Sequence, residues 1–189
     1  MRLFIAVNFD EEFRKTLLRY QAELKKYADP YAKVNWSSPA NLHLTLAFIG
    51  EYDVPGNVCA ALDGLSFAPF SITADRCGNF GSLWWVGLKN GNQAVALSDA
   101  VRSRLKTANI PFDPKPMKPH ITLAREFYPQ IPPRIRPMPA ETAVTRVSLM
   151  KSERIAGKLT YTELYGMNAA EQYFHKNLSL YKRGTHENL

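Results

Sequence analysis

The sequence feature that most constrains the fold is a five-residue pattern that occurs twice. The runs His43 to Ala47 and His120 to Ala124 share the order histidine, apolar residue, threonine, leucine, alanine. The chain has four histidines, and matching threonines and leucines beside two of them are improbable at ordinary amino-acid usage. Both runs alternate polar and apolar residues as half-buried strands do. The repeat therefore predicts two strands of the same design.

Each predicted strand has one polar and one apolar face, because side chains alternate along a strand. His43 and Thr45 share a face, as do His120 and Thr122. Strict alternation places the apolar side chains of each strand on its other face: Leu42, Leu44, Leu46 and Phe48 in the first, Ile121 and Leu123 in the second. We expect the two polar faces to meet across a cleft.

The remaining pattern predicts a mixed order of helices and strands. A strand at Leu3–Asn8 precedes a helix that is capped by Asp10 and ends before Pro30. Further helices are expected over 58–65 and 92–108, and further strands over 42–49, 70–74, 83–88, 120–124, 143–150 and 159–165. Nine of the thirteen prolines lie between Pro111 and Pro139, which favours loops there. Because helices and strands do not alternate regularly, the class is α+β.

Length and composition favour one folded unit. The chain has 189 residues, of which 46% are hydrophobic, so it can bury a sizeable core. The apolar run Leu3 to Val7 is too short for a membrane span or a signal sequence, so we expect a cytoplasmic protein without membrane association. Cys59 and Cys77 fit neither a disulfide framework nor a zinc site.

The charge favours an anionic partner. The net charge is +7, and the stretch from Arg102 to Arg136 holds eight basic and two acidic residues, which gives 8 − 2 = +6. Such an excess suits nucleic acid or another polyanion. On charge alone, a solvated surface that keeps the protein soluble is the preferred explanation, so the charge does not identify a function.

The repeated residues suit phosphodiester cleavage. A neutral imidazole accepts a proton and a protonated one donates a proton, both near physiological pH, so His43 and His120 form a candidate acid–base pair. Thr45 and Thr122 can donate hydroxyls to a phosphate oxygen. Arg125 can neutralise the same anion. Together, these residues can bind a phosphate and transfer protons without a metal ion.

Each of these residues also has a structural explanation. A strand histidine often only satisfies a backbone partner, and threonine is common in strands. Arg125 can be ordinary surface charge, and Phe48, which can stack on a base, can equally belong to the core. The repeat favours function most strongly for the two histidines.

At the level of whole motifs, the chain resembles the 2H phosphoesterase superfamily. The resemblance is to its RNA 2′,3′-cyclic phosphodiesterases, historically called 2′-5′ RNA ligases. It is carried by residues 2–7, 41–50 and 119–125, and more loosely by Ser152, Gly157, Tyr161 and Leu164. The resemblance implies that residues 1–189 form a single bilobal catalytic domain. It also implies a pseudo-symmetric α+β fold with an antiparallel sheet in each lobe, flanking helices and a central cleft between the histidines.

The resemblance also implies an activity. Members hydrolyse RNA or nucleoside 2′,3′-cyclic phosphate ends to 2′-phosphates, with 2′-5′ RNA ligation as a weak reverse-type activity. No metal or other cofactor is implied, and the expected partners are RNA ends or small cyclic nucleotides, bound by a monomer. By the same resemblance, His43 is the acid and His120 the base. The alternative is a non-catalytic nucleotide- or RNA-binding module that uses the same cleft, although both histidines and both threonines are present.

Two features depart from the family pattern. Ala47 stands where the family often has a charged residue, and the tail after Met167 is particular to this chain. The tail is expected to be mostly exposed. It contains His175 and His186, which lack the repeated context and receive no role.

Overall fold

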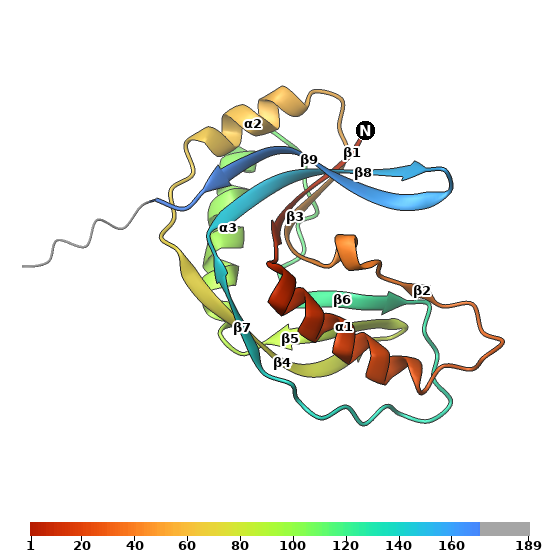
Figure 1. Cartoon of the computed structure of the whole chain (residues 1–189). Helices are drawn as coiled ribbons and strands as arrows, with labels where there is room; N and C mark the ends of the chain where they lie inside the picture. The colour runs from red at the N-terminus through yellow and green to blue at the C-terminus, as the bar shows by residue number, and fades with distance from the viewer. Residues whose placement is uncertain (171–189) are drawn as a thin grey trace, which may run out of the picture.

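The computed structural model describes residues 1–170, in which three α-helices pack on a curled antiparallel sheet (Figure 1). The helices are α1 (Glu11–Lys25), α2 (Pro55–Asp63) and α3 (Gly91–Thr107). The strands are β1 (Arg2–Asn8), β2 (Asn35–Trp36), β3 (His43–Glu51), β4 (Phe70–Phe80), β5 (Leu83–Leu88), β6 (His120–Arg125), β7 (Ala140–Val144), β8 (Arg146–Ile155) and β9 (Lys158–Asn168).

The strands form one sheet in the order β7-β4-β5-β6-β3-β1-β8-β9, with β2 paired to β6. The predicted α+β class with antiparallel strands is confirmed. Within residues 1–170, strand pairing joins the two halves of this sheet, β7-β4-β5-β6 and β3-β1-β8-β9, through a single residue pair, Leu44 with Ile121. Both side chains are buried. A pseudo-symmetric division into two lobes stays a prediction.

Helix α1 begins where the sequence predicts. Asp10 caps it by accepting a hydrogen bond from the Phe13 backbone N–H at 2.7 Å, and Glu11 and Glu12 lie in the first turn, where acidic groups favour the helix dipole. The other carboxylate oxygen of Asp10 accepts from the Thr142 hydroxyl at 2.6 Å. The cap therefore also fixes α1 to β7.

Several strand boundaries differ from the prediction. The expected strand over 143–150 is two strands, β7 and β8, which pair with different neighbours. Strands β8 and β9 continue beyond the predicted ranges as a long hairpin, whose turn residues Ala156 and Gly157 both have positive φ. The two-residue strand β2 was not predicted. Most of the expected exposed tail, including His175 and His186, lies outside the described residues.

Strand β1 is buried on both faces, which explains its continuous apolar run. Leu3, Ile5 and Val7 belong to the main core, which also contains the apolar sides of the three helices. Phe4 and Ala6 belong to a smaller cluster with Met150, against which Phe48 and Tyr161 pack. This smaller cluster lies under the candidate site.

Each copy of the repeat contains a β-bulge, which strict alternation does not predict. Ile5 and Ala6 pair with Ala47 and Thr45, so β3 has an extra residue, Leu46. Trp84 and Trp85 pair with Ala124 and Thr122, so β6 has an extra residue, Leu123. The two leucines occupy the same position in the repeat, three residues after the histidine.

The bulges reverse the alternation of the residues that follow them. Phe48 was expected on the core face with Leu44 and Leu46, and this is wrong. It pairs with Phe4 and packs on the smaller cluster, on the same side as His43. Ala124 points into the main core, and Arg125 turns toward the site face. Phe48 and Arg125 both follow their histidine by five residues.

Candidate active site

The pairing of Leu44 with Ile121 brings the two copies of the repeat together. Because the pairing is antiparallel, the register set by this pair places His43 opposite Thr122 and Thr45 opposite His120. Opposed residues in a sheet point to the same side. All four polar side chains of the repeat therefore share the face opposite the main core.

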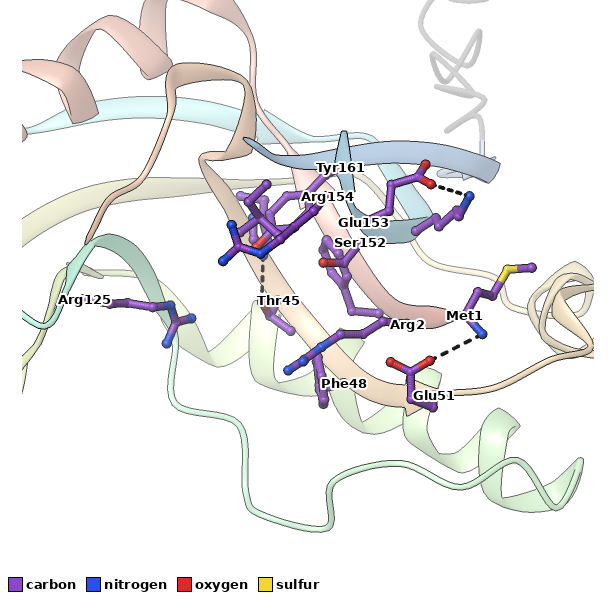
Figure 2. A pocket seen from close by; sticks show the side chains of 14 residues that line it. Met1, Arg2, Thr45, Phe48, Glu51, Arg125, Ser152, Glu153, Arg154 and Tyr161 are labelled. Carbon is purple, nitrogen blue, oxygen red and sulfur yellow. Dashed lines mark hydrogen bonds and ion pairs between the residues drawn. The ribbon is translucent and has the colours of Figure 1, made fainter. Parts of the chain in front are cut away.

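Three cavities meet on this face. The Arg2 cavity, of about 700 Å³, is lined by residues that include Arg2, His43, Thr45, Phe48 and Arg125. Figure 2 shows Arg125 on one side of it and Arg2 and Phe48 on another. The Lys118 cavity, of about 640 Å³, is lined by His120 and Lys118 and shares Thr45 and Phe48 with the first.

The third, the Trp36 cavity, has a volume of about 620 Å³. It is lined by Trp36 and Thr122 and shares His43 and Arg125 with the Arg2 cavity. All six residues singled out from the sequence thus line connected cavities. Their chemical roles remain predictions.

His43 is held in one tautomer by its neighbours. Its Nδ1 lies 2.7 Å from the backbone carbonyl of Asn41, which only accepts hydrogen bonds, so Nδ1 carries the proton and donates. In the neutral ring, Nε2 then accepts from the Thr45 hydroxyl at 3.0 Å. Phe4 and Tyr161 pack against the imidazole, with ring centroids 4.9 and 5.3 Å away.

An equivalent hydrogen bond orients His120. Its Nδ1 donates to the backbone carbonyl of Lys118 at 2.6 Å. Lys118 precedes His120 by two residues, as Asn41 precedes His43. Phe80 meets the ring edge-on at 5.3 Å. In both histidines, Nε2 is consequently the nitrogen left for proton transfer.

Both histidines have lowered pKa values. Burial lowers the pKa of His43 from 6.5 to about 4, with further lowering by the positive charges of Arg125 and His120, whereas the Asn41 carbonyl opposes the shift. Burial also lowers the pKa of His120, and Arg125 and Lys118 add to this effect against the Lys118 carbonyl. Both rings are thus neutral at pH 7 in the ligand-free protein.

The remaining predicted residues have distinct surroundings. Thr45 bonds to His43, so its hydroxyl must turn from the imidazole to reach a phosphate. The ring of Phe48 is half-buried and has the Arg2 guanidinium 5.0 Å above its centre. Arg125 is exposed at the rim of two cavities. A base that stacks on Phe48 has to displace Arg2 or lie beside it.

Four site residues were missed from the sequence as site residues: Arg2, Phe4, Arg154 and Tyr161. Phe4 was read as part of a core strand, and the hydrophobic pattern gave no sign that β1 has two buried faces. Tyr161 was noted only as a family position. Its edge-on contacts with His43 and Phe4 depend on the long-range pairing of β8 with β1, which brings the β8–β9 hairpin beside these residues.

The described residues were predicted to contain neither a zinc site nor a membrane span, and the structure bears on both kinds of feature. Residues 1–170 contain no group of three or more histidine, cysteine or acidic side chains arranged to hold a metal ion. Cys59 and Cys77 are free thiols, and burial raises the pKa of Cys77 to about 12. Among these same residues, none of the helices has the length and apolarity needed to cross a membrane.

Comparison with known proteins identifies the family. Residues 7–84 match the family described as LigT like Phosphoesterase. The RNA 2′,3′-cyclic phosphodiesterase of Thermotoga maritima is 30% identical over 87% of this chain and 94% of its own length. The chain belongs to the LigT-like phosphoesterase family. The predicted resemblance is therefore confirmed at the level of the family.

Other members of the LigT-like family agree in sequence and fold. The RNA 2′,3′-cyclic phosphodiesterase of Thermus thermophilus is 32% identical, over 87% of this chain and 88% of its own length. The crystal structure of Escherichia coli LigT complexed with 3′-AMP has a TM-score of 0.74 at 26% identity and covers 90% of this chain and 98% of that one. The similarity extends over nearly the whole fold.

The lowered pKa values predict how the ligand-free protein titrates. By NMR, the His43 imidazole should titrate near pH 4 and His120 below 6.5. Because the unfolded chain binds these protons at higher pH, the free energy of unfolding should rise as the pH increases from about 4 to 6.5. His43→Asn should flatten this rise in urea titrations. A His43 pKa near 6.5 would contradict the burial of its ring.

Proposed function

We propose that this protein hydrolyses 2′,3′-cyclic phosphate ends of RNA or nucleosides to 2′-phosphates by acid–base catalysis. The observation that carries the proposal is the placement of two histidines on one face, each with Nδ1 held by a backbone carbonyl and Nε2 left to transfer a proton. Arg125 at the cavity rim supplies the positive charge for the phosphate. The named relatives support the same reaction.

The reaction requires one base and one acid. His120 takes a proton from water as the water oxygen attacks phosphorus, and the bond between phosphorus and O3′ breaks. His43 gives its Nε2 proton to O3′, which leaves a 2′-phosphate and a free 3′-hydroxyl. Arg125, Thr45 and Thr122 donate to the non-bridging oxygens as charge accumulates there. In ligation a 5′-hydroxyl attacks phosphorus in place of water, so His120 again takes the proton and His43 again protonates O3′, which leaves a 2′-5′ linkage. The histidines exchange roles only when that linkage is cleaved back to the cyclic phosphate.

The lowered pKa of His43 bears on this assignment. Because His43 has its pKa lowered to about 4, it holds a proton weakly in the ligand-free site. A bound phosphate anion favours the protonated form of a nearby imidazole. The substrate itself therefore promotes protonation of His43, and a weakly held proton is readily given to the leaving oxygen.

Three narrower statements accompany the proposal. The protein acts as a cytoplasmic monomer, and residues 1–189 form one catalytic domain. Neither metal nor other cofactor takes part, because the two imidazoles supply both proton transfers. A binding module without turnover is the alternative, and the assay below separates the two.

Replacing either histidine should nearly abolish hydrolysis. His43→Ala and His120→Ala should each lower kcat by about 10² to 10⁴, the usual contribution of a proton-transfer partner. The double variant should be little worse than either single one, because the two residues act as a unit. Hydrolysis of adenosine 2′,3′-cyclic phosphate in EDTA measures this. Loss of wild-type turnover on chelation, with recovery on adding a divalent ion, would contradict the metal-free mechanism, and no turnover in any condition would favour the binding module.

Arg125 should stabilise the transition state through the paired N–H donors of its guanidinium. Arg125→Ala should cost about 2–3 kcal/mol of transition-state stabilisation, and lysine should restore only part of it, because an ammonium lacks the bidentate geometry. An acid–base pair gives a bell-shaped pH profile of kcat/KM, and this shape should persist in both variants, since arginine does not titrate near neutrality. If Arg125 is only surface charge, both variants will keep wild-type kcat/KM on the mononucleotide.

A further inference from the structure

The first inference concerns the Trp36 cavity, which lies between the β8–β9 hairpin and residues 35–41. Asn41 joins its two walls by donating to the Leu159 carbonyl at 2.9 Å. Arg154 donates to the Gly157 carbonyl at 3.0 Å and so stiffens the hairpin turn. The cavity thus begins at His43 and extends toward the hairpin turn.

Charge distinguishes this cavity from the other two. Its lining includes Arg125, Arg154 and Lys158 and, within residues 1–170, no carboxylate. The Arg2 cavity contains Glu51 and Glu153, and the Lys118 cavity contains Asp113. Hydroxyl and amide groups of the kind that contact sugar and phosphate complete the lining: Asn35, Ser37, Ser38 and Thr160.

We propose that the Trp36 cavity binds the sugar–phosphate backbone of the RNA strand on the 5′ side of the cyclic phosphate end. This inference rests on the proposed function, because it extends the same substrate by one nucleotide. A mononucleotide lacks the upstream phosphate that Lys158 and Arg154 would meet. The contacts are to the sugar–phosphate backbone rather than to a base, because the Trp36 ring already packs against other side chains. Its centroid lies 5.2 Å from that of Phe127 and 5.4 Å from Lys25 Nζ.

Lys158 allows a clean test, because it is exposed and lines only this one of the three cavities. In Lys158→Ala, kcat/KM for a dinucleotide ending in adenosine 2′,3′-cyclic phosphate should fall about two- to fivefold, as expected for an exposed charge pair. The salt dependence should weaken by about 0.7 in log–log slope. Turnover of adenosine 2′,3′-cyclic phosphate should not change. Lys15→Ala, an exposed lysine on α1, should affect neither substrate.

A change in Lys158→Ala that is equal for both substrates, or absent for the dinucleotide, would overturn the subsite. Binding of a dinucleotide with a 2′-phosphate end, compared with adenosine 2′-phosphate, gives a second readout by calorimetry. If the wild type turns over neither cyclic substrate, the proposed function fails. A loss of dinucleotide affinity in Lys158→Ala would still support the subsite, and unchanged affinity would overturn it.

A second inference rests on the two bulges. The two extra residues, Leu46 and Leu123, each have a carbonyl that accepts a hydrogen bond from a buried helix side chain. Ser98 of α3 donates to Leu46 at 2.6 Å, and Gln21 of α1 donates to Leu123 at 3.0 Å. Ser98 and Gln21 are 0% and 4% exposed. Two of the few buried polar side chains in the described chain thus donate hydrogen bonds to equivalent positions of the repeat.

The bulges decide which side chains reach the site. If the same residues formed regular strands without bulges, Phe48 and Arg125 would alternate onto the core face. We infer that Ser98 and Gln21 are positioning residues, which hold Phe48 and Arg125 respectively in the site through the bulges. They act on the reaction without touching the substrate.

Double-mutant cycles on kcat/KM test this inference. Each helix variant is measured in a background that lacks the site residue it is inferred to position, and the matched control is the background that lacks the other site residue. Gln21→Leu should lower kcat/KM by up to about 10²-fold in wild type, the effect of a small misplacement. In an Arg125→Ala background it should have less than a tenth of that effect, because no guanidinium remains to misplace. Ser98→Ala should keep its full effect in the Arg125→Ala background and lose it in Phe48→Ala.

Circular dichroism and urea unfolding establish that each variant is folded under assay conditions. Gln21→Met, which has nearly the same side-chain length, replaces Gln21→Leu if leucine prevents folding. Equal losses of kcat/KM with and without Arg125 would show that Gln21 only stabilises the fold and would overturn the positioning role. The same outcome for Ser98 with and without Phe48 would overturn it there.

Discussion

A single antiparallel residue pair, Leu44 with Ile121, is the contact on which the rest of the site depends. Within the described chain, it is the only residue pair between β3 and β6, and it joins the two halves of the sheet. The polar members of both repeats flank this pair, so the register that it sets also sets the relation of the two histidines. Its apolar side chains are anchored in the main core. The face that carries both histidines therefore lies directly over the main core.

Burial then gives the site its electrostatic character. The same packing that fixes the rings of His43 and His120 disfavours their charged forms, and nearby cations act in the same direction. The resting site combines neutral imidazoles with the permanent charges of Arg2, Arg125 and Arg154. In the proposed reaction, an anionic substrate supplies the opposite charge and favours protonation of His43. The proposal therefore couples phosphate binding to proton transfer.

The sequence was informative where local pattern determines structure. The repeat identified β3, β6 and the histidine face, because alternation holds from His43 to Thr45 and from His120 to Thr122. Alternation failed after each bulge, since the Ser98 and Gln21 hydrogen bonds that accompany the bulges come from distant helices. Arg125 was chosen for its chemistry although its position in a regular strand points to the core. Arg2, Phe4 and Tyr161 could not be predicted as site residues, because pairing of β1, β8 and β9 brings them to His43.

The central claim is that His43 and His120 divide the roles of acid and base. The most direct measurement compares His43→Ala and His120→Ala on adenosine 2′,3′-cyclic phosphate and on 3′-deoxyadenosine 2′-(4-nitrophenyl phosphate). This ester keeps phosphorus on O2′, has no 3′-hydroxyl to attack it, and has a leaving group that needs no protonation. The account predicts that His43→Ala recovers most of its lost kcat/KM on the nitrophenyl ester, whereas His120→Ala stays impaired. Equal impairment of both variants on both substrates would contradict the division of roles, and recovery of His120→Ala alone would reverse the assignment.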